Sequence, residues 1–284
     1  MGTYDDGAFQ AAYDKVMAKW PADREAVTVP TPFGGTYVNV CGPRDAPPLL
    51  LLPGGGGATS ASWFAQAADL ARVRRVYAVD LVGAAGRTEA RGVRTVGDLG
   101  DWLDAVLAGL GIEPTAPVDL GGHSYGAWIA LHHALRAPDR VSRLFLLDPT
   151  QCFAGFETAY LLRALPMLLR PTPRRVWAFL DWESGGAGLD PDWLRLQETA
   201  AGFPAGRPVT GPRPTPEALR GLRARVLLFV AANSRTHDPC EVAARADEWL
   251  PHVETVVLPD VSHHQLPVAA PSGMGRRLIS FLGV

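Results

Sequence analysis

The chain has 284 residues, of which 47% are hydrophobic and 20% are charged, and its formal net charge is −2. A chain of this length and composition can bury a large core, which argues against intrinsic disorder, and its charge balance argues against a nucleic-acid partner. The N-terminal segment has early acidic residues and no apolar signal-peptide core, and no run approaches the ~18 apolar residues of a membrane helix. We therefore expect a cytoplasmic protein with no membrane partner.

Three cysteines are spread far apart along the chain and form no C-x-x-C pair: Cys41, Cys152 and Cys240. This spacing argues against a disulfide framework and against a zinc site. We therefore expect neither a metal nor another cofactor.

The first hundred residues open with a helical pattern and continue with strand patterns. Residues 8–20 have the periodicity of an amphipathic helix, and residues 26–42 alternate like a β-hairpin with Gly34 and Gly35 at its turn. Residues 47–57, PPLLLLPGGGG, are an apolar run that ends in glycines. Such a run is typical of a buried parallel strand that ends in a tight loop.

Five more apolar runs follow, and helical patterns separate several of them. The runs span residues 74–83, 116–122, 141–149, 224–233 and 253–260. Helical periodicity occupies residues 95–111, 124–140 and 239–251. This alternation predicts an α/β fold with a mostly parallel central sheet that is flanked by helices on both faces.

The alternation is interrupted between the fourth and fifth of these six runs. Residues 153–223 contain apolar helical pieces and a connector rich in proline and glycine, with no evident strand. Because the segment is short and lies between strands of one sheet, we interpret it as a helical cap over the sheet. The predicted organisation is a first core part at 1–152, a helical cap at 153–223 and a second core part at 224–284.

The stretch LGGHSYG at residues 120–126 contains the pattern G-x-S-x-G, centred on Ser124. It follows an apolar run and precedes a helical pattern, which is the strand–turn–helix context of a nucleophile elbow. Glycines two places on either side let the strand and the helix approach closely. The strained turn then exposes the serine hydroxyl near the N-terminus of a helix, where negative charge is stabilised.

With this motif, the chain resembles enzymes of the α/β-hydrolase fold over residues 25–284. It is most similar to bacterial carboxylesterase-like members, in which an LL(S/D)P strand end, a helical cap and a late RA…P helix follow the elbow. Here these features are FLLDPTQCFAGF, residues 153–223 and ARADEWLP. The resemblance implies that Ser124 is the nucleophile and that a histidine and a carboxylate activate it.

The family places its catalytic histidine in a loop after the last strand, where this chain has VVLPDVSHHQLP. Alignment on the common pattern LPGAGHH implies His263 as the base, with His264 as the alternative. We expect the five other histidines to have structural or solvated positions. His123 packs beside the sheet in this interpretation, His132 and His133 are ordinary helix residues, and His237 and His252 are solvated loop residues.

The carboxylate departs from the family's commonest pattern. The usual acid position, in the loop after the fifth run, holds Ser234 within AANSRTHDP. Two candidates remain. Asp148 ends the strand LFLLDP, a position that some family members use for the acid, and Asp238 precedes Pro239 and reads better as a helix cap.

The glycine run after the first strand, LLLLPGGGG, implies an oxyanion hole, although Pro53 replaces the family's usual histidine. Gly55 takes the position of one backbone donor, with Gly56 as the alternative register. Tyr125, directly after the serine, supplies the other N–H group.

These residues predict a serine hydrolase that acts on an ester-type, moderately hydrophobic small molecule and needs no other partner, as a monomer or a homodimer. The alternatives are a secondary-metabolism enzyme that uses the same residues for elimination (such as acetate loss), acyl transfer or cyclisation, and a small-molecule receptor. We expect an uncharged substrate because the cap has residues apolar enough to line a pocket, although most of them are better explained as cap core: Phe153, Phe156, Leu161, Leu165, Trp177, Phe179 and Trp182.

Overall fold

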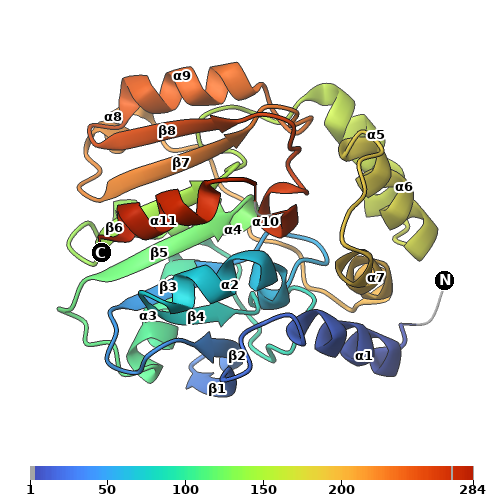
Figure 1. The fold of residues 1–284 in the computed structure, drawn as a ribbon, viewed down its shortest axis with the longest axis horizontal. Helices are drawn as coiled ribbons and strands as arrows, with labels where there is room; N and C mark the ends of the chain where they lie inside the picture. The colour runs from blue at the N-terminus through green and yellow to red at the C-terminus, as the bar shows by residue number, and fades with distance from the viewer. Residues whose placement is uncertain (1–3, 270, 284) are drawn as a thin grey trace.

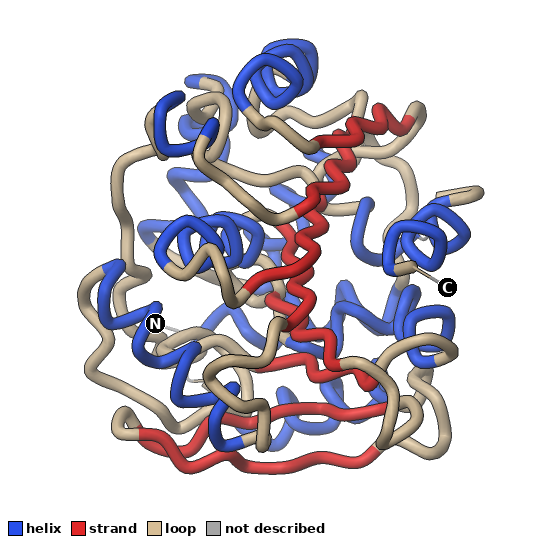
Figure 2. The backbone as a smooth tube through the Cα atoms, turned by 90° about the vertical axis from the view of Figure 1, so that its left-hand side faces the viewer, coloured by secondary structure: helices blue, strands red, loops and turns tan. Residues whose placement is uncertain are grey.

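The computed structural model describes residues 4–269 and 271–283. Within these residues, eight strands form one twisted sheet in the order β1-β2-β4-β3-β5-β6-β7-β8 (Figures 1 and 2). The strands are β1 (Glu25–Thr31), β2 (Gly34–Cys41), β3 (Pro48–Leu52), β4 (Arg75–Val79), β5 (Val118–His123), β6 (Val141–Leu147), β7 (Arg225–Ala231) and β8 (Val253–Leu258). β2 pairs antiparallel with β1 and β4, and the remaining neighbours are parallel.

Helices cover both faces of this sheet. The helices are α1 (Asp6–Met17), α2 (Phe64–Ala71), α3 (Val96–Gly109), α4 (Tyr125–Arg136), α5 (Thr158–Leu169), α6 (Pro173–Glu183), α7 (Pro191–Thr199), α8 (Pro216–Arg220), α9 (Pro239–Trp249), α10 (Leu266–Ala269) and α11 (Met274–Leu282). In the part of the chain that is described, none of these helices is long and apolar enough to cross a bilayer.

Two hydrophobic cores form because successive side chains of a strand point to opposite faces. Leu50 and Leu52 of β3 belong to the core under α3, α4 and α9, whereas Leu49 and Leu51 belong to the core under α1, α2 and α11. All four leucines are fully buried. Because its consecutive leucines point to opposite faces, β3 contributes side chains to both cores. The predicted fold class is confirmed.

The first hairpin differs in detail from its prediction. Thr31 pairs with Gly34, so Pro32 and Phe33 form the two-residue turn and the glycines begin β2. The Thr31 hydroxyl donates to the Gly34 carbonyl oxygen (2.7 Å) and accepts from the Phe33 N–H (3.1 Å). These hydrogen bonds of the Thr31 side chain close the turn immediately before the two glycines. Gly34, the first residue of β2, has a positive φ of 116°, a conformation that glycine adopts readily.

Helices α5 to α8 lie between β6 and β7, where the sequence predicts a cap. Figure 1 shows α5, α6 and α7 beyond the ends of the central strands, to one side of the sheet. α7 packs against α1, and α6 packs against both α5 and α7. The boundaries of the cap at 153 and 223 stay a prediction.

Candidate active site

Ser124 lies between the last residue of β5 and the first residue of α4, in a strained backbone conformation. Its φ of 54° and ψ of −117° are rare for a residue with a side chain. A Cβ atom on Gly122 would lie 2.5 Å from the Ala127 nitrogen, and one on Gly126 would lie 2.3 Å from the Leu52 carbonyl oxygen. Only glycine fits at either position, so the motif reflects close packing of strand and helix.

Ser124, His263 and Asp148 form a continuous chain of hydrogen bonds. His263 Nε2 lies 2.8 Å from Ser124 Oγ, and His263 Nδ1 lies 2.7 Å from Asp148 Oδ2. A carboxylate can only accept, so the Nδ1–H group donates to Asp148 and the neutral imidazole keeps Nε2 free to accept from the serine hydroxyl. Because the Asp148 and His263 side chains are almost fully buried, water cannot compete for this bond.

Asp148 is held by three further donors besides His263. Its Oδ1 accepts from the Ala231 N–H (3.0 Å) and from His237 Nε2 (3.1 Å), and its Oδ2 accepts from the Ser234 hydroxyl (2.8 Å). Burial alone raises the pKa of the Asp148 carboxyl, but the charge and hydrogen bond of His237, together with those of His263, hold this pKa well below its usual range. The carboxylate is therefore ionised at neutral pH.

His237 is buried, and the prediction that it is a solvated loop residue is wrong. The residue is 2% exposed and forms an ion-pair contact with Asp148. Burial lowers the pKa of His237, but the Asp148 carboxylate outweighs this effect and raises that pKa above its ordinary value. The loop after β7 folds back beside β6, which brings His237 under Asp148. Ser234, at the family's usual acid position, is the one feature of the sequence that indicates a contact between this loop and the catalytic acid.

The alternative residues for the acid and the base lie outside this chain of hydrogen bonds. Asp238 caps α9, where its Oδ1 accepts from the Cys240 N–H (2.8 Å) and the Glu241 N–H (3.3 Å). The His264 ring contacts the Tyr160 hydroxyl at 3.3 Å, and burial lowers the pKa of His264 to about 4. Of the two candidates for each role, the structure thus places His263 and Asp148, the preferred ones, in contact with each other.

The glycine loop after β3 lies against the elbow. A Cβ atom on Gly54 would lie 3.5 Å from Ser124 Cβ, and one on Gly55 would lie 3.5 Å from Tyr125 Cβ. Tyr125 begins α4, so its N–H has no acceptor within the helix. Gly56, the alternative register, has a φ of 72° and no atom near the site of a Cβ.

Glu183, at the end of α6, contacts the loop that carries His263. It is 1% exposed, and its carboxylate accepts from the Ser262 hydroxyl (2.7 Å), the His263 N–H (3.1 Å) and the His264 N–H (3.2 Å). Glu183 could not be predicted as part of the site because nothing in RVWAFLDWE distinguishes it from a solvent-facing glutamate. The cap and the histidine loop are therefore joined by a buried carboxylate.

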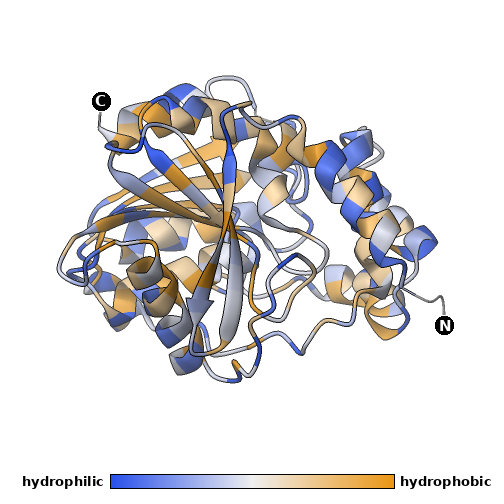
Figure 3. Ribbon diagram, turned by 90° about the horizontal axis from the view of Figure 1, so that it is seen from below, coloured by the Kyte–Doolittle hydropathy of each residue, from blue (hydrophilic) through white to orange (hydrophobic). Residues whose placement is uncertain are grey.

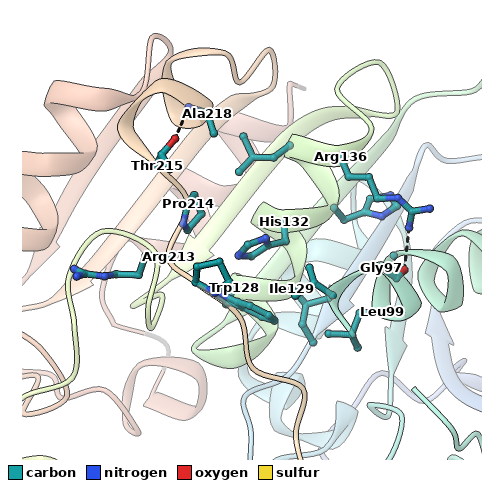
Figure 4. Close-up of a pocket in the computed structure, with 15 residues that line it drawn as sticks. Gly97, Leu99, Trp128, Ile129, His132, Arg136, Arg213, Pro214, Thr215 and Ala218 are labelled. Carbon is teal, nitrogen blue, oxygen red and sulfur yellow. Dashed lines mark hydrogen bonds between the residues drawn. The ribbon is translucent and has the colours of Figure 1, made fainter. Parts of the chain in front are cut away.

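Of the other histidines, His123 does pack beside the sheet, and its Nε2 lies 3.0 Å from the His263 carbonyl oxygen. His132 and His133 lie on α4. His132 lines a hollow of about 380 Å³ between α3, α4 and residues 212–218 (Figure 4). This hollow contains no member of the Ser124–His263–Asp148 chain.

The apolar cap residues named from the sequence divide into three groups. Phe156, Phe179 and Trp182 cluster with Tyr160 on the side of His264. Phe153 is part of the core over α3 and α4. The remaining three are each 46% exposed and so do not belong to the cap core: Leu161, Leu165 and Trp177. Helix α5 is apolar around its whole circumference, so its sequence does not show which face points inward.

Comparisons with known proteins agree with this architecture. The model of the alpha/beta hydrolase family matches residues 49–274. Carboxylesterase YbfK of Bacillus subtilis is 28% identical over 290 residues, which cover 96% of this chain and 93% of that protein. The crystal structure of naproxen esterase (carboxylesterase NP) from Bacillus subtilis superposes with a TM-score of 0.88 at 26% identity, covering 98% of this chain and 99% of that one.

Proposed function

Because this chain belongs to the alpha/beta hydrolase family, we propose that it is a serine hydrolase that cleaves carboxylic esters. The observation that carries the proposal is the unbroken contact from Ser124 through His263 to Asp148, at 2.8 Å and 2.7 Å. The names of the Bacillus relatives, a carboxylesterase and a naproxen esterase, support the choice of ester over other acyl compounds.

In the proposed reaction, Ser124 Oγ attacks the ester carbonyl carbon while His263 Nε2 accepts the hydroxyl proton. The imidazolium returns this proton to the alkoxide oxygen, so the alcohol leaves and an acyl-enzyme remains. Water then attacks the acyl carbon and gives a proton to His263. The imidazolium passes this proton to Ser124 Oγ as the bond from Oγ to the acyl carbon breaks, so the carboxylic acid leaves and both side chains are restored. Asp148 keeps the proton of His263 on Nδ1 and stabilises the imidazolium, while the N–H groups of Gly55 and Tyr125 stabilise the oxyanion.

The proposed substrate is an uncharged, moderately hydrophobic ester. Three aromatic side chains, Phe156, Tyr160 and Trp182, support this choice because they are partly exposed and cluster with the buried Phe179 beside His264. A panel of esters that differ only in the charge of the acyl group tests it. Higher kcat/KM for the charged members contradicts the proposal.

The first experiment is the intact mass of the protein after treatment with a fluorophosphonate. We expect one adduct on the wild type, none on Ser124→Ala, and a loss of ester hydrolysis of roughly 10⁵–10⁶-fold in that variant. Ser142→Ala, a change at an exposed serine of β6, is the matched control and should label like the wild type. Product analysis completes the test: alcohol plus acid supports hydrolysis, whereas an alkene plus acid contradicts it in favour of elimination.

A further inference from the structure

The outer surface of the cap carries an uncovered apolar patch. Among the described residues, eight large hydrophobic side chains are exposed, and six of them lie on the α5–α6 hairpin. These six, which we call the cap patch, are Leu161, Leu162, Leu165, Leu168, Leu169 and Trp177. Figure 3 shows the cap helices at the side of the molecule, with strongly hydrophobic segments beside hydrophilic ones. Exposed large hydrophobic side chains that gather on one helical hairpin, rather than being scattered singly, usually mark an interaction site.

The patch is additional to the surface that holds the cap in place. Tyr160, Ala164 and Met167 form the inner face of α5 and pack with the core on that side of the sheet. Helical spacing places Leu162, Leu165 and Leu169 on the opposite face of the same helix. Leu161 and Leu168 lie along one side of that face. Burial of the inner face therefore does not explain why the outer face is apolar.

The surroundings of the patch are positively charged, although the whole chain has a net charge of −2. Residues 158–183 contain four exposed arginines, Arg163, Arg170, Arg174 and Arg175, and one exposed carboxylate, Asp181. Within the described ranges, none of these four guanidinium groups forms an ion pair. Arg175 donates to the carbonyl oxygens of Pro166 and Arg170, each at 3.0 Å, and the Arg163 guanidinium lies 5.9 Å from the centre of the Trp182 ring. The charges of Arg170 and Arg174 therefore remain available to an anionic partner.

We propose that the cap patch docks the protein on an anionic lipid–water interface. A helix face of leucines bordered by arginines can bury its apolar side chains among acyl chains while the guanidinium groups stay at the headgroups. A second copy of this chain is a poorer occupant because a two-fold contact would place the unpaired arginines of both copies together. A protein partner is also a poorer fit, since leucine is under-represented among the residues that dominate such interfaces.

Flotation with lipid vesicles tests the proposal, using the full chain with Ser124→Ala so that no ester is cleaved. We expect binding to vesicles of phosphatidylcholine mixed with phosphatidylglycerol to be at least roughly tenfold tighter than binding to phosphatidylcholine alone. The triple change Leu162→Gln, Leu168→Gln and Leu169→Gln should weaken binding to the mixed vesicles by roughly tenfold or more. Arg170→Gln with Arg174→Gln should remove most of the preference for the anionic lipid.

The matched control carries Val27→Gln and Val257→Gln, which alter the other two exposed large hydrophobics, on β1 and β8. This control should float like the parent protein. Failure of the parent to float overturns the proposal, as does a leucine variant that floats like the control. A dimer in sedimentation velocity that dissociates in the leucine variant assigns the patch to a second copy instead. Hydrolysis of a soluble ester by the leucine variant with Ser124 restored reports on the proposed esterase function separately, because no lipid takes part in that assay.

Discussion

Asp148 receives hydrogen bonds from two histidines, a serine and a backbone N–H, and this concentration of donors defines the site at the scale of single residues. The carboxylate comes from the end of β6, whereas the family's usual position after β7 holds Ser234. Neighbouring strands lie about 4.8 Å apart. A carboxylate at the end of β6 can therefore contact the same histidine as a carboxylate at the end of β7. Ser234 stays in contact with the acid and donates to it.

The identity of the acid leads to the first prediction. Asp148→Asn should lower kcat by about 10⁴-fold, because an amide cannot keep the proton of His263 on Nδ1 or stabilise the imidazolium. Ester hydrolysis at saturating substrate measures this loss, and fluorophosphonate labelling should slow in parallel.

Asp238→Asn is the matched control for that prediction, since asparagine caps a helix as well as aspartate does. We expect nearly wild-type activity and stability from it. Normal activity in Asp148→Asn together with a large loss in Asp238→Asn would transfer the role of the acid to Asp238.

At the scale of elements, α6 of the cap is bound to the loop after β8 by Glu183. The carboxylate accepts from the backbone of both His263 and His264, so the position of the imidazole depends on a helix inserted between β6 and β7. α7 makes a similar contact on the other side, where Gln197 Nε2 donates to the Gly57 carbonyl oxygen at 3.0 Å. The cap therefore supports both loops that flank Ser124.

The second prediction concerns this support. Glu183→Gln replaces one acceptor oxygen by an NH₂ group, which cannot accept from a backbone N–H, so the histidine loop should shift. We expect kcat and kcat/KM for a soluble ester to fall together, by roughly tenfold to a hundredfold, because a small displacement of the base is costly.

The control is Asp181→Asn, at an exposed carboxylate on the same helix, which should leave both constants unchanged. A rise in KM alone for Glu183→Gln contradicts the positioning role and places Glu183 in substrate binding instead.

At the scale of the whole molecule, the ion pair of His237 with Asp148 links global stability to pH. The pKa of His237 is raised in the folded protein, so its contribution is complete below its unfolded pKa of about 6.5 and is lost as pH rises through the raised value. The pKa of Asp148 is lowered, so its contribution is complete above about 3.9 and is lost as pH falls toward the lowered value. The pair stabilises the fold most between these limits.

The third prediction follows from these signs. The free energy of unfolding of the wild type should exceed that of His237→Gln at pH 5.5, and the difference should shrink as the pH is raised to 9. Urea denaturation at a series of pH values measures it, with His252→Gln, at an exposed histidine, as the control. A difference that stays constant over this range means that His237 acts through packing alone.

The sequence by itself determined the features that depend on short-range sterics and periodicity. Apolar runs alternate with helical patterns because each strand and helix must bury its own face, which is why the sheet and its flanking helices could be predicted. The position of Ser124 is equally local, since Gly122 and Gly126 are needed for the backbone of the elbow to close. These constraints operate within a few residues, so the local pattern records them.

Only the tertiary structure decided which distant residues meet. Along the chain Asp148 is the preferred candidate and Asp238 the alternative, and contact with the histidine goes to Asp148 because β6 lies beside β7 and the loop after β7 folds back beside Asp148. His237 is buried for the same reason. The contact of Glu183 with the histidine loop, and the choice of the face of α5 that points inward, likewise depend on packing between segments far apart in sequence. No local pattern encodes such contacts, because their energy arises only when the strands and the cap have assembled.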